Sequence, residues 1–167
     1  MIEIVQGDIT TLDIDAIVNA ANSALAGGGG VDGAINDAAG PELVVASRAL
    51  APCPTGRAVI TPGFRLPARF VIHAVGPIWY GGKSREPELL RETYDSAFRV
   101  ARAQGSIRSI AFPAISTGVY GYPKEPAARI ALEVMRAHEA EFTRIVACVF
   151  GKESLEIYER IMKELRS

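Results

Sequence analysis

The feature that most constrains the fold of this chain is a regular alternation of short apolar segments with longer segments of helical periodicity. Segments such as 70–75 and 145–150 are apolar at nearly every position, a pattern that is typical of strands buried on both faces. The helical segments between them would supply the cover that such a sheet needs. We therefore predict an α/β fold, a three-layer α/β/α domain with a largely central sheet.

The predicted elements cover the whole chain. Strands are expected at 2–5, 16–19, 58–61, 70–75, 107–112 and 145–150. Helices are expected from Val31, over 41–49, and around 90–101, 127–138 and 155–165, where apolar residues recur at helical spacing. Pro41 fits the first position of its helix, and Gly105 fits the end of another. Because there is no linker, repeat or low-complexity segment, residues 1–167 are predicted to form a single domain.

Composition and charge argue against several classes of function. The net charge of −1 gives no electrostatic reason to expect general nucleic-acid binding. No apolar run approaches the roughly 18 residues of a membrane span, and the N-terminus lacks the features of a signal peptide. The two cysteines, Cys53 and Cys148, lack metal-site spacing and fit a reducing compartment. We expect a cytoplasmic protein with no membrane association, no metal ion and no cofactor.

A glycine-rich stretch lies between Asn19 and Gly40, with consecutive glycines over 27–30 and another at Gly33. Glycine is favoured where the backbone needs positive φ or where another molecule approaches it closely. A helical pattern follows at once, so the loop would direct free N–H groups and the positive end of a helix dipole at one point. The sequence therefore favours a phosphate site over a mobile surface loop.

A second loop of similar character follows the strand predicted at 107–112. Residues 113–123 carry hydroxyl groups and glycines and lead into another helical segment. In open α/β sheets, ligands bind outside the carboxyl ends of the strands, where both loops would lie. Two such loops could hold a diphosphate from both sides, although an ordinary turn would also explain Gly118 and Gly121.

Four motifs together resemble a known family. They are GDIT at 7–10, NAAN at 19–22, GGGVDGAI at 28–35 and ISTGVYGYP at 115–123, and they look like those of a macrodomain of the MacroD type. The resemblance covers essentially the whole chain. It implies a mixed six-stranded sheet between helices that binds ADP-ribose. Many members hydrolyse the ester between ADP-ribose and an acidic side chain, or deacetylate O-acetyl-ADP-ribose, without a metal ion.

The resemblance also implies roles for individual residues. Near the adenine it implies Asp8 as acceptor for the amino group, the backbone of Ile9 beside it, and Phe150 packed on the base. A turn-capping Asp8 and a core Phe150 remain the alternatives. Asn22 would bond the distal ribose, whereas Asn19 is expected to support the loop. The residues implied at the phosphates are Gly29, Gly30, Val31, Ser116, Thr117, Gly118, Val119 and Tyr120.

Asp32 is not explained by phosphate binding, because a carboxylate close to a diphosphate is repelled by it. It must either cap the helix or face the reacting carbon. The resemblance favours the second interpretation, in which Asp32 orients or deprotonates a water near the distal ribose, with Asn22 as the other catalytic candidate. The substrates expected are O-acetyl-ADP-ribose and mono-ADP-ribosylated proteins.

Asn36 departs from the family pattern, since many MacroD-type members carry histidine there. Asparagine cannot titrate near neutral pH and cannot share acid–base chemistry. The chain is therefore predicted to be either a hydrolase or a non-catalytic ADP-ribose binding module. Binding of poly(ADP-ribose) or RNA in the same cleft is a third hypothesis. His73 and His138 are both expected to be structural.

Overall fold

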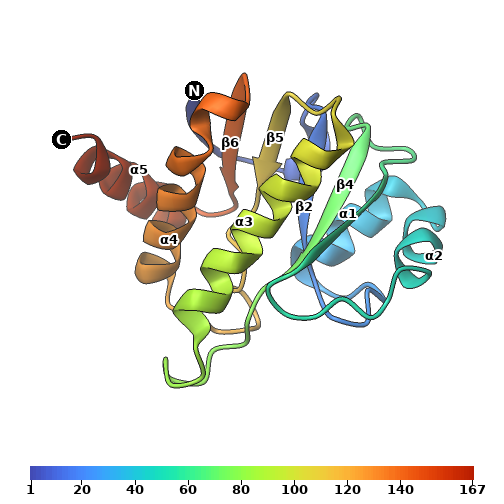
Figure 1. Cartoon of the computed structure of the whole chain (residues 1–167), viewed down its shortest axis with the longest axis horizontal. Coiled ribbons are helices and arrows are strands. Elements are labelled where there is room, and N and C mark those ends of the chain that lie inside the picture. The colour runs from blue at the N-terminus through green and yellow to red at the C-terminus, as the bar shows by residue number, and fades with distance from the viewer.

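The computed structural model describes all residues 1–167 and contains a single six-stranded sheet, order β1-β6-β5-β2-β4-β3. The strands are β1 (Ile2–Gln6), β2 (Ala16–Ala21), β3 (Ala58–Pro62), β4 (Phe70–Val75), β5 (Ser109–Phe112) and β6 (Arg144–Val149). The helices are α1 (Gly30–Ala39), α2 (Glu42–Arg48), α3 (Glu86–Gln104), α4 (Lys124–Ala137) and α5 (Lys152–Arg166). Helices lie on both faces of the sheet (Figure 1), so the predicted three-layer α/β fold is confirmed.

The sheet is mixed, because every strand pairing is parallel except the antiparallel pairing of β3 with β4. Parallel strands point their carboxyl ends to the same edge. The loops that follow β1, β6, β5, β2 and β4 therefore gather at one edge of the sheet, at the bottom of Figure 1. This edge is where ligands of such folds bind.

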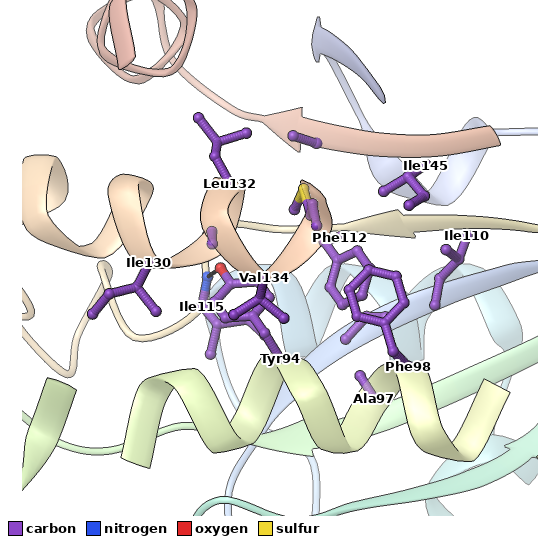
Figure 2. Packing of buried hydrophobic residues seen from close by; sticks show 14 of the residues in the cluster. Tyr94, Ala97, Phe98, Ile110, Phe112, Ile115, Ile130, Leu132, Val134 and Ile145 are labelled. Atoms are coloured by element: carbon purple, nitrogen blue, oxygen red, sulfur yellow. Dashed lines mark hydrogen bonds between the residues drawn. The ribbon is translucent and has the colours of Figure 1, made fainter. Parts of the chain in front are cut away.

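Alternate residues of the central strands enter two separate cores, one on each face. In β2, Ala16 and Val18 join the larger core with α3, α4 and α5, whereas Ile17 joins the smaller core with α1 and α2. Figure 2 shows part of the larger core, in which Phe98 of α3 packs against Phe112 of β5 at a ring separation of 4.8 Å. The strands read as apolar throughout because both of their faces are buried.

Element boundaries differ from the prediction at points that matter for the site. Strand β2 continues to Ala21, so Asn19 lies inside the strand and does not close it. Strand β6 ends at Val149, and the side chain of Phe150 is 92% exposed. The alternative interpretation of Phe150 as a core residue is therefore wrong. Pro41 is the N-cap residue of α2 and not its first helical residue.

None of the helices combines the length and the apolar character that crossing a membrane requires.

Candidate functional site

The glycine-rich loop joins β2 to α1 and is closed by the side chain of Asn22. Its Nδ2 donates to the carbonyl of Gly27 at 2.9 Å, and its Oδ1 accepts from the N–H of Ala26 at 3.3 Å. Gly27 and Gly30 have φ of +79° and +57°, values that glycine adopts without strain. These bonds give the loop a defined shape, which argues against a mobile linker.

Helix α1 begins directly after this loop with free backbone donors. Its N-cap is Gly29, and no side chain caps the end. The first N–H groups of a helix have no partner within it, so those of Gly30 and Val31 are available to an anion at the positive end of the dipole. Gly33 allows helix α1 to pack closely against the glycine-rich loop, since a Cβ on residue 33 would lie 2.7 Å from the carbonyl oxygen of Gly28.

Asp32 is the third residue of α1, and its carboxylate is held by two amide groups. Oδ1 accepts from Nδ2 of Asn19 and from Nδ2 of Asn36, both at 2.9 Å. Oδ2 accepts no hydrogen bond within the protein and lies beside Gly28, where a Cβ would be 3.5 Å from it. Because the carboxylate bonds side chains and not the helix end, the interpretation of Asp32 as a helix cap is wrong.

The environment of Asp32 works against its negative charge. The residue is only 6% exposed. Burial raises the pKa of Asp32, and the hydrogen bonds from Asn19 and Asn36 oppose that rise. The two amide donors thus favour the ionised form of a buried carboxylate.

Asn36 fixes Asp32 from within the same helix. Its Nδ2 donates to both the backbone carbonyl of Asp32, at 3.0 Å, and the carboxylate. Residues four positions apart on a helix are neighbours, which explains the contact. Asn36 therefore supplies a hydrogen bond at this position but no titratable group.

We expected Asn19 to support the loop, but its side chain bonds Asp32 instead. It lies in the middle of β2, and its Nδ2 also contacts Nδ1 of His73 at 3.3 Å. His73 of β4 is 2% exposed and bonds the hydroxyl of Thr61 through Nε2, which confirms it as a satisfied buried residue. Burial lowers the pKa of His73 to about 4. In the sequence, this cluster is indicated by Asn19 and His73, two polar side chains inside otherwise apolar strands.

The second loop, 113–123, follows β5, the neighbour of β2 in the sheet. Its base is held by Tyr94, whose hydroxyl contacts the carbonyl of Pro113 and accepts from the N–H of Ile115. Ser116 has φ of +69°, and its buried Oγ has no partner. A Cβ at Gly76 would lie 2.3 Å from that oxygen, so the loop after β4 packs tightly here.

Further bonds shape the tip of the second loop. Thr117 Oγ1 donates to the carbonyl of Ala114 at 2.9 Å, and the N–H of Gly121 bonds the carbonyl of Gly118 at 3.0 Å. The carbonyl of Tyr120 accepts from the N–H of Trp79 at 2.9 Å, which ties the tip to the loop after β4. Val119 projects outward and is 98% exposed. These hydrogen bonds give the loop a defined shape, and its tip is accessible to a ligand.

Asp8 and Phe150 follow the ends of β1 and β6, two neighbouring strands at the far end of the same edge. The N–H of Gly7 bonds the carbonyl of Val149 at 3.0 Å, which brings the ends of β1 and β6 together. Oδ1 of Asp8 accepts from the backbone and the hydroxyl of Thr10, and these bonds lower the pKa of Asp8. Asp8 therefore caps the short turn at Ile9–Thr11 and still has Oδ2 free of any protein partner.

The side chains thus follow the order of the strands. Asp8 and Phe150 follow β1 and β6, the two loops follow β5 and β2, and Asp32 lies just beyond the second of these strands. Neighbouring strands are about 4.8 Å apart, so the row spans roughly 15 Å. The edge suits an elongated ligand with an aromatic group at one end and phosphates in the middle. The structure contains no group of three or more His, Cys, Asp or Glu side chains placed to hold a metal ion.

Replacement of Asp32 by Asn tests the cost of the buried charge. Asn keeps an oxygen that accepts from Asn19 and Asn36 but removes the ionisation that burial opposes. Because the folded-state pKa is raised, wild-type stability falls as pH rises from the unfolded to the folded pKa, then stays constant. We expect the Tm of Asp32→Asn to lie a few degrees above that of the wild type at pH 7. This difference should shrink as the pH falls through the folded-state pKa of Asp32 and vanish below its unfolded-state pKa.

The measurement is Tm by calorimetry across pH, with Asp37→Asn, an exposed site on the same helix, as the control. A lower Tm of Asp32→Asn at pH 7 would show that the ionised carboxylate stabilises the fold.

Comparison with known proteins identifies the family. The model of the family described as Macro domain matches residues 18–131. A macro domain-containing protein of Ralstonia nicotianae is 57% identical over 161 residues, which are 96% of this chain and 94% of that protein. A Klebsiella pneumoniae protein named O-acetyl-ADP-ribose deacetylase is 50% identical over 167 residues, covering 96% of this chain and 95% of that protein.

Solved structures agree with this sequence relationship. The Oceanobacillus iheyensis macrodomain with ADP has a TM-score of 0.92 and 45% identity, and the match covers 99% of this chain and 91% of that chain. The Trypanosoma brucei macrodomain in complex with ADP-ribose has a TM-score of 0.88 and 41% identity, covering 96% of this chain and 68% of that chain. The matching family model, the closely similar relatives and the shared fold lead to one conclusion: this chain belongs to the macro domain family.

Proposed function

We propose that this protein binds ADP-ribose and hydrolyses ADP-ribosyl esters by attack of a water that Asp32 assists, without a metal ion. The observation that carries the proposal is the state of the Asp32 carboxylate. Oδ1 is held by two amide donors, whereas Oδ2 is free beside the glycine loop. A carboxylate fixed at one oxygen and open at the other suits general-base chemistry.

The order of groups along the sheet edge supports ADP-ribose as the ligand. The adenine lies on Phe150, with its amino group on Asp8 and the backbone of Ile9 beside it. The diphosphate lies between two sets of backbone donors, one at 29–31 and one at 116–120, and gains from the positive end of the α1 dipole. Similar proteins solved with ADP and with ADP-ribose support the same assignment.

The distal ribose is then brought to Asp32 and Asn22. Nδ2 of Asn22 has two hydrogens, of which the loop uses one on the carbonyl of Gly27. The second hydrogen can bond a ribose hydroxyl. Asn22 therefore both shapes the loop and positions the substrate, which supports its assignment to the site.

The reaction adds water across an ester. The bond between the acyl carbon and the ribose oxygen, or that between the anomeric carbon and the carboxyl oxygen, is replaced by a bond to water oxygen. Ionised Asp32 orients this water and accepts its proton, which then passes to the departing oxygen. The products are ADP-ribose and a carboxylic acid. This chemistry is common to O-acetyl-ADP-ribose and to acidic side chains of mono-ADP-ribosylated proteins.

A second candidate function is a non-catalytic ADP-ribose binding module. The observation that favours it is Asn36, which supplies no proton to the leaving group. Time-resolved release of ADP-ribose separates the two, because a module would bind the ligand and release none. A third candidate, poly(ADP-ribose) or RNA in the same cleft, would show strong salt dependence, and the net charge of −1 disfavours it.

Asp32→Ala tests the catalytic assignment. The variant keeps both phosphate loops, so the Kd for ADP-ribose should stay within a few-fold of wild type. Loss of a positioned general base should lower the hydrolysis rate by about 10² to 10⁴-fold. The measurement is release of ADP-ribose from O-acetyl-ADP-ribose and from a glutamate-linked mono-ADP-ribosylated protein. Asp37→Ala is the control, and unchanged turnover in Asp32→Ala would remove Asp32 from the mechanism.

Gly33→Ala tests the glycine loop as the phosphate site. Alanine favours a helix over glycine by about 1 kcal/mol, so propensity alone predicts a harmless change. The new Cβ would nevertheless lie 2.7 Å from the carbonyl oxygen of Gly28, and the loop must move. We expect the affinity for ADP-ribose, measured by titration calorimetry, to fall roughly tenfold or more. Ala34→Ser, exposed on the same helix, is the control; equal affinities for Gly33→Ala and wild type would contradict the assignment.

A further inference from the structure

A row of four polar side chains crosses the buried sheet and ends at Asp32. Thr61 of β3 contacts Nε2 of His73 in β4 at 3.0 Å, and Nδ1 of His73 contacts Nδ2 of Asn19 in β2 at 3.3 Å. Nδ2 of Asn19 then bonds Oδ1 of Asp32 in α1 at 2.9 Å. The register of the sheet makes the row possible, because Asn19 and His73 are direct partners across β2 and β4.

The chemistry of the groups fixes the direction of every bond in the row. An amide nitrogen only donates, so Nδ1 of His73 must accept from Asn19. The ring proton is then on Nε2 and is donated to the hydroxyl oxygen of Thr61. The hydroxyl in turn donates a hydrogen bond to the backbone carbonyl of Pro62 at 3.1 Å. The row therefore requires a neutral His73 in one tautomer.

The surroundings of His73 keep it neutral. Burial lowers the pKa of His73 to about 4, and its neighbours on β3 and β2 are the uncharged side chains of Thr61 and Asn19. The hydrogen-bond contacts of its two ring nitrogens are with these uncharged side chains, Nδ1 with Asn19 and Nε2 with Thr61. Asp32 is reached only through Asn19, and Asn36 is the other side chain that bonds the Asp32 carboxylate.

The Asn19 amide has two possible orientations, and only one supports the site. If the amide were turned over, its oxygen would face Oδ1 of ionised Asp32, which can only accept. In the structure the nitrogen faces them, although Oδ1 of Asn19 is left buried without a hydrogen-bond partner. A buried acceptor without a partner is costly. The Asp32 carboxylate selects this orientation in spite of that cost, and Nδ1 of His73 accepts the second Nδ2 hydrogen and thereby reinforces it.

We propose that His73 is a positioning residue of the hydrolytic site. By accepting from Asn19, His73 orients the amide that holds Oδ1 of Asp32 and thereby leaves Oδ2 directed to the water. This inference rests on the proposed hydrolase function. It assigns to β4 a contribution parallel to that of Asn36, so that donors from the sheet and from α1 fix the carboxylate together.

Two measurements without substrate test the row directly. Ring ¹⁵N shifts of His73 should report the Nε2–H tautomer, unprotonated at pH 5 and above. The ¹³C titration of Asp32 should show a higher pKa in His73→Leu than in wild type, because the amide donor is no longer held. An Nδ1–H tautomer, a protonated ring at pH 6, or an unchanged pKa of Asp32 in His73→Leu would each overturn the inference.

Kinetics supply the second test. Without His73 the hydrogen bond from Asn19 to the charged Asp32 carboxylate is lost. His73→Leu should therefore lower kcat for O-acetyl-ADP-ribose by roughly tenfold to a hundredfold. The acid limb of the kcat profile should move to higher pH, while the Kd for ADP-ribose stays within a few-fold. His73→Asn, whose oxygen can accept from Asn19, should recover most of the rate. Thr61→Val frees the ring proton and should give an intermediate loss.

His138→Gln is the matched control, since His138 pairs with Asp95 and Glu141 and is not connected to the row. A folded His73→Leu with wild-type kcat and acid limb would overturn the inference. So would a loss of rate that His73→Asn does not recover and that leaves the acid limb in place, because it marks a purely structural role. If the wild type releases no ADP-ribose, the proposed function fails, and the NMR measurements still decide whether His73 positions Asp32.

Discussion

The pairing of Asp32 with two amide donors is the interaction on which the site depends. Burial disfavours the charge of this carboxylate, and the hydrogen bonds from Asn19 and Asn36 restore part of what water would supply. Both donors bond the same oxygen, so the other oxygen lies beside Gly28 without a hydrogen bond from the protein. Without this asymmetry the helix end would be a phosphate site and nothing more.

The parallel sheet converts the local geometry into a binding edge. Since β1, β6, β5, β2 and β4 all point the same way, the segments after them lie in one row. Each segment brings different chemistry: a free carboxylate oxygen and an aromatic ring at one end, backbone donors in the middle, and Asp32 at the other end. The two cores pack against the two faces of the sheet behind this edge, and Tyr94, buried in the larger core, bonds the base of the second loop.

The sequence was sufficient to predict the layers, the strand and helix order and the two loops, because periodicity and glycine placement report them directly. The sequence was not sufficient to predict which way individual side chains of the site point. Asn19 was expected to close a strand, yet β2 runs on to Ala21 and turns Asn19 toward Asp32. Phe150 is exposed because β6 ends one residue earlier than expected. The contact between Asn36 and Asp32 was available from their spacing of four, but its geometry was not.

The most direct test of how Asp32 and the two loops act is a crystal structure of this protein with ADP-ribose. We predict that the adenine lies on Phe150 and the diphosphate between the backbones of 29–31 and 116–120. The distal ribose should lie within hydrogen-bond reach of Asn22, with Oδ2 of Asp32 facing its anomeric carbon through a water. A distal ribose directed away from Asp32, or a diphosphate outside the two loops, would contradict it.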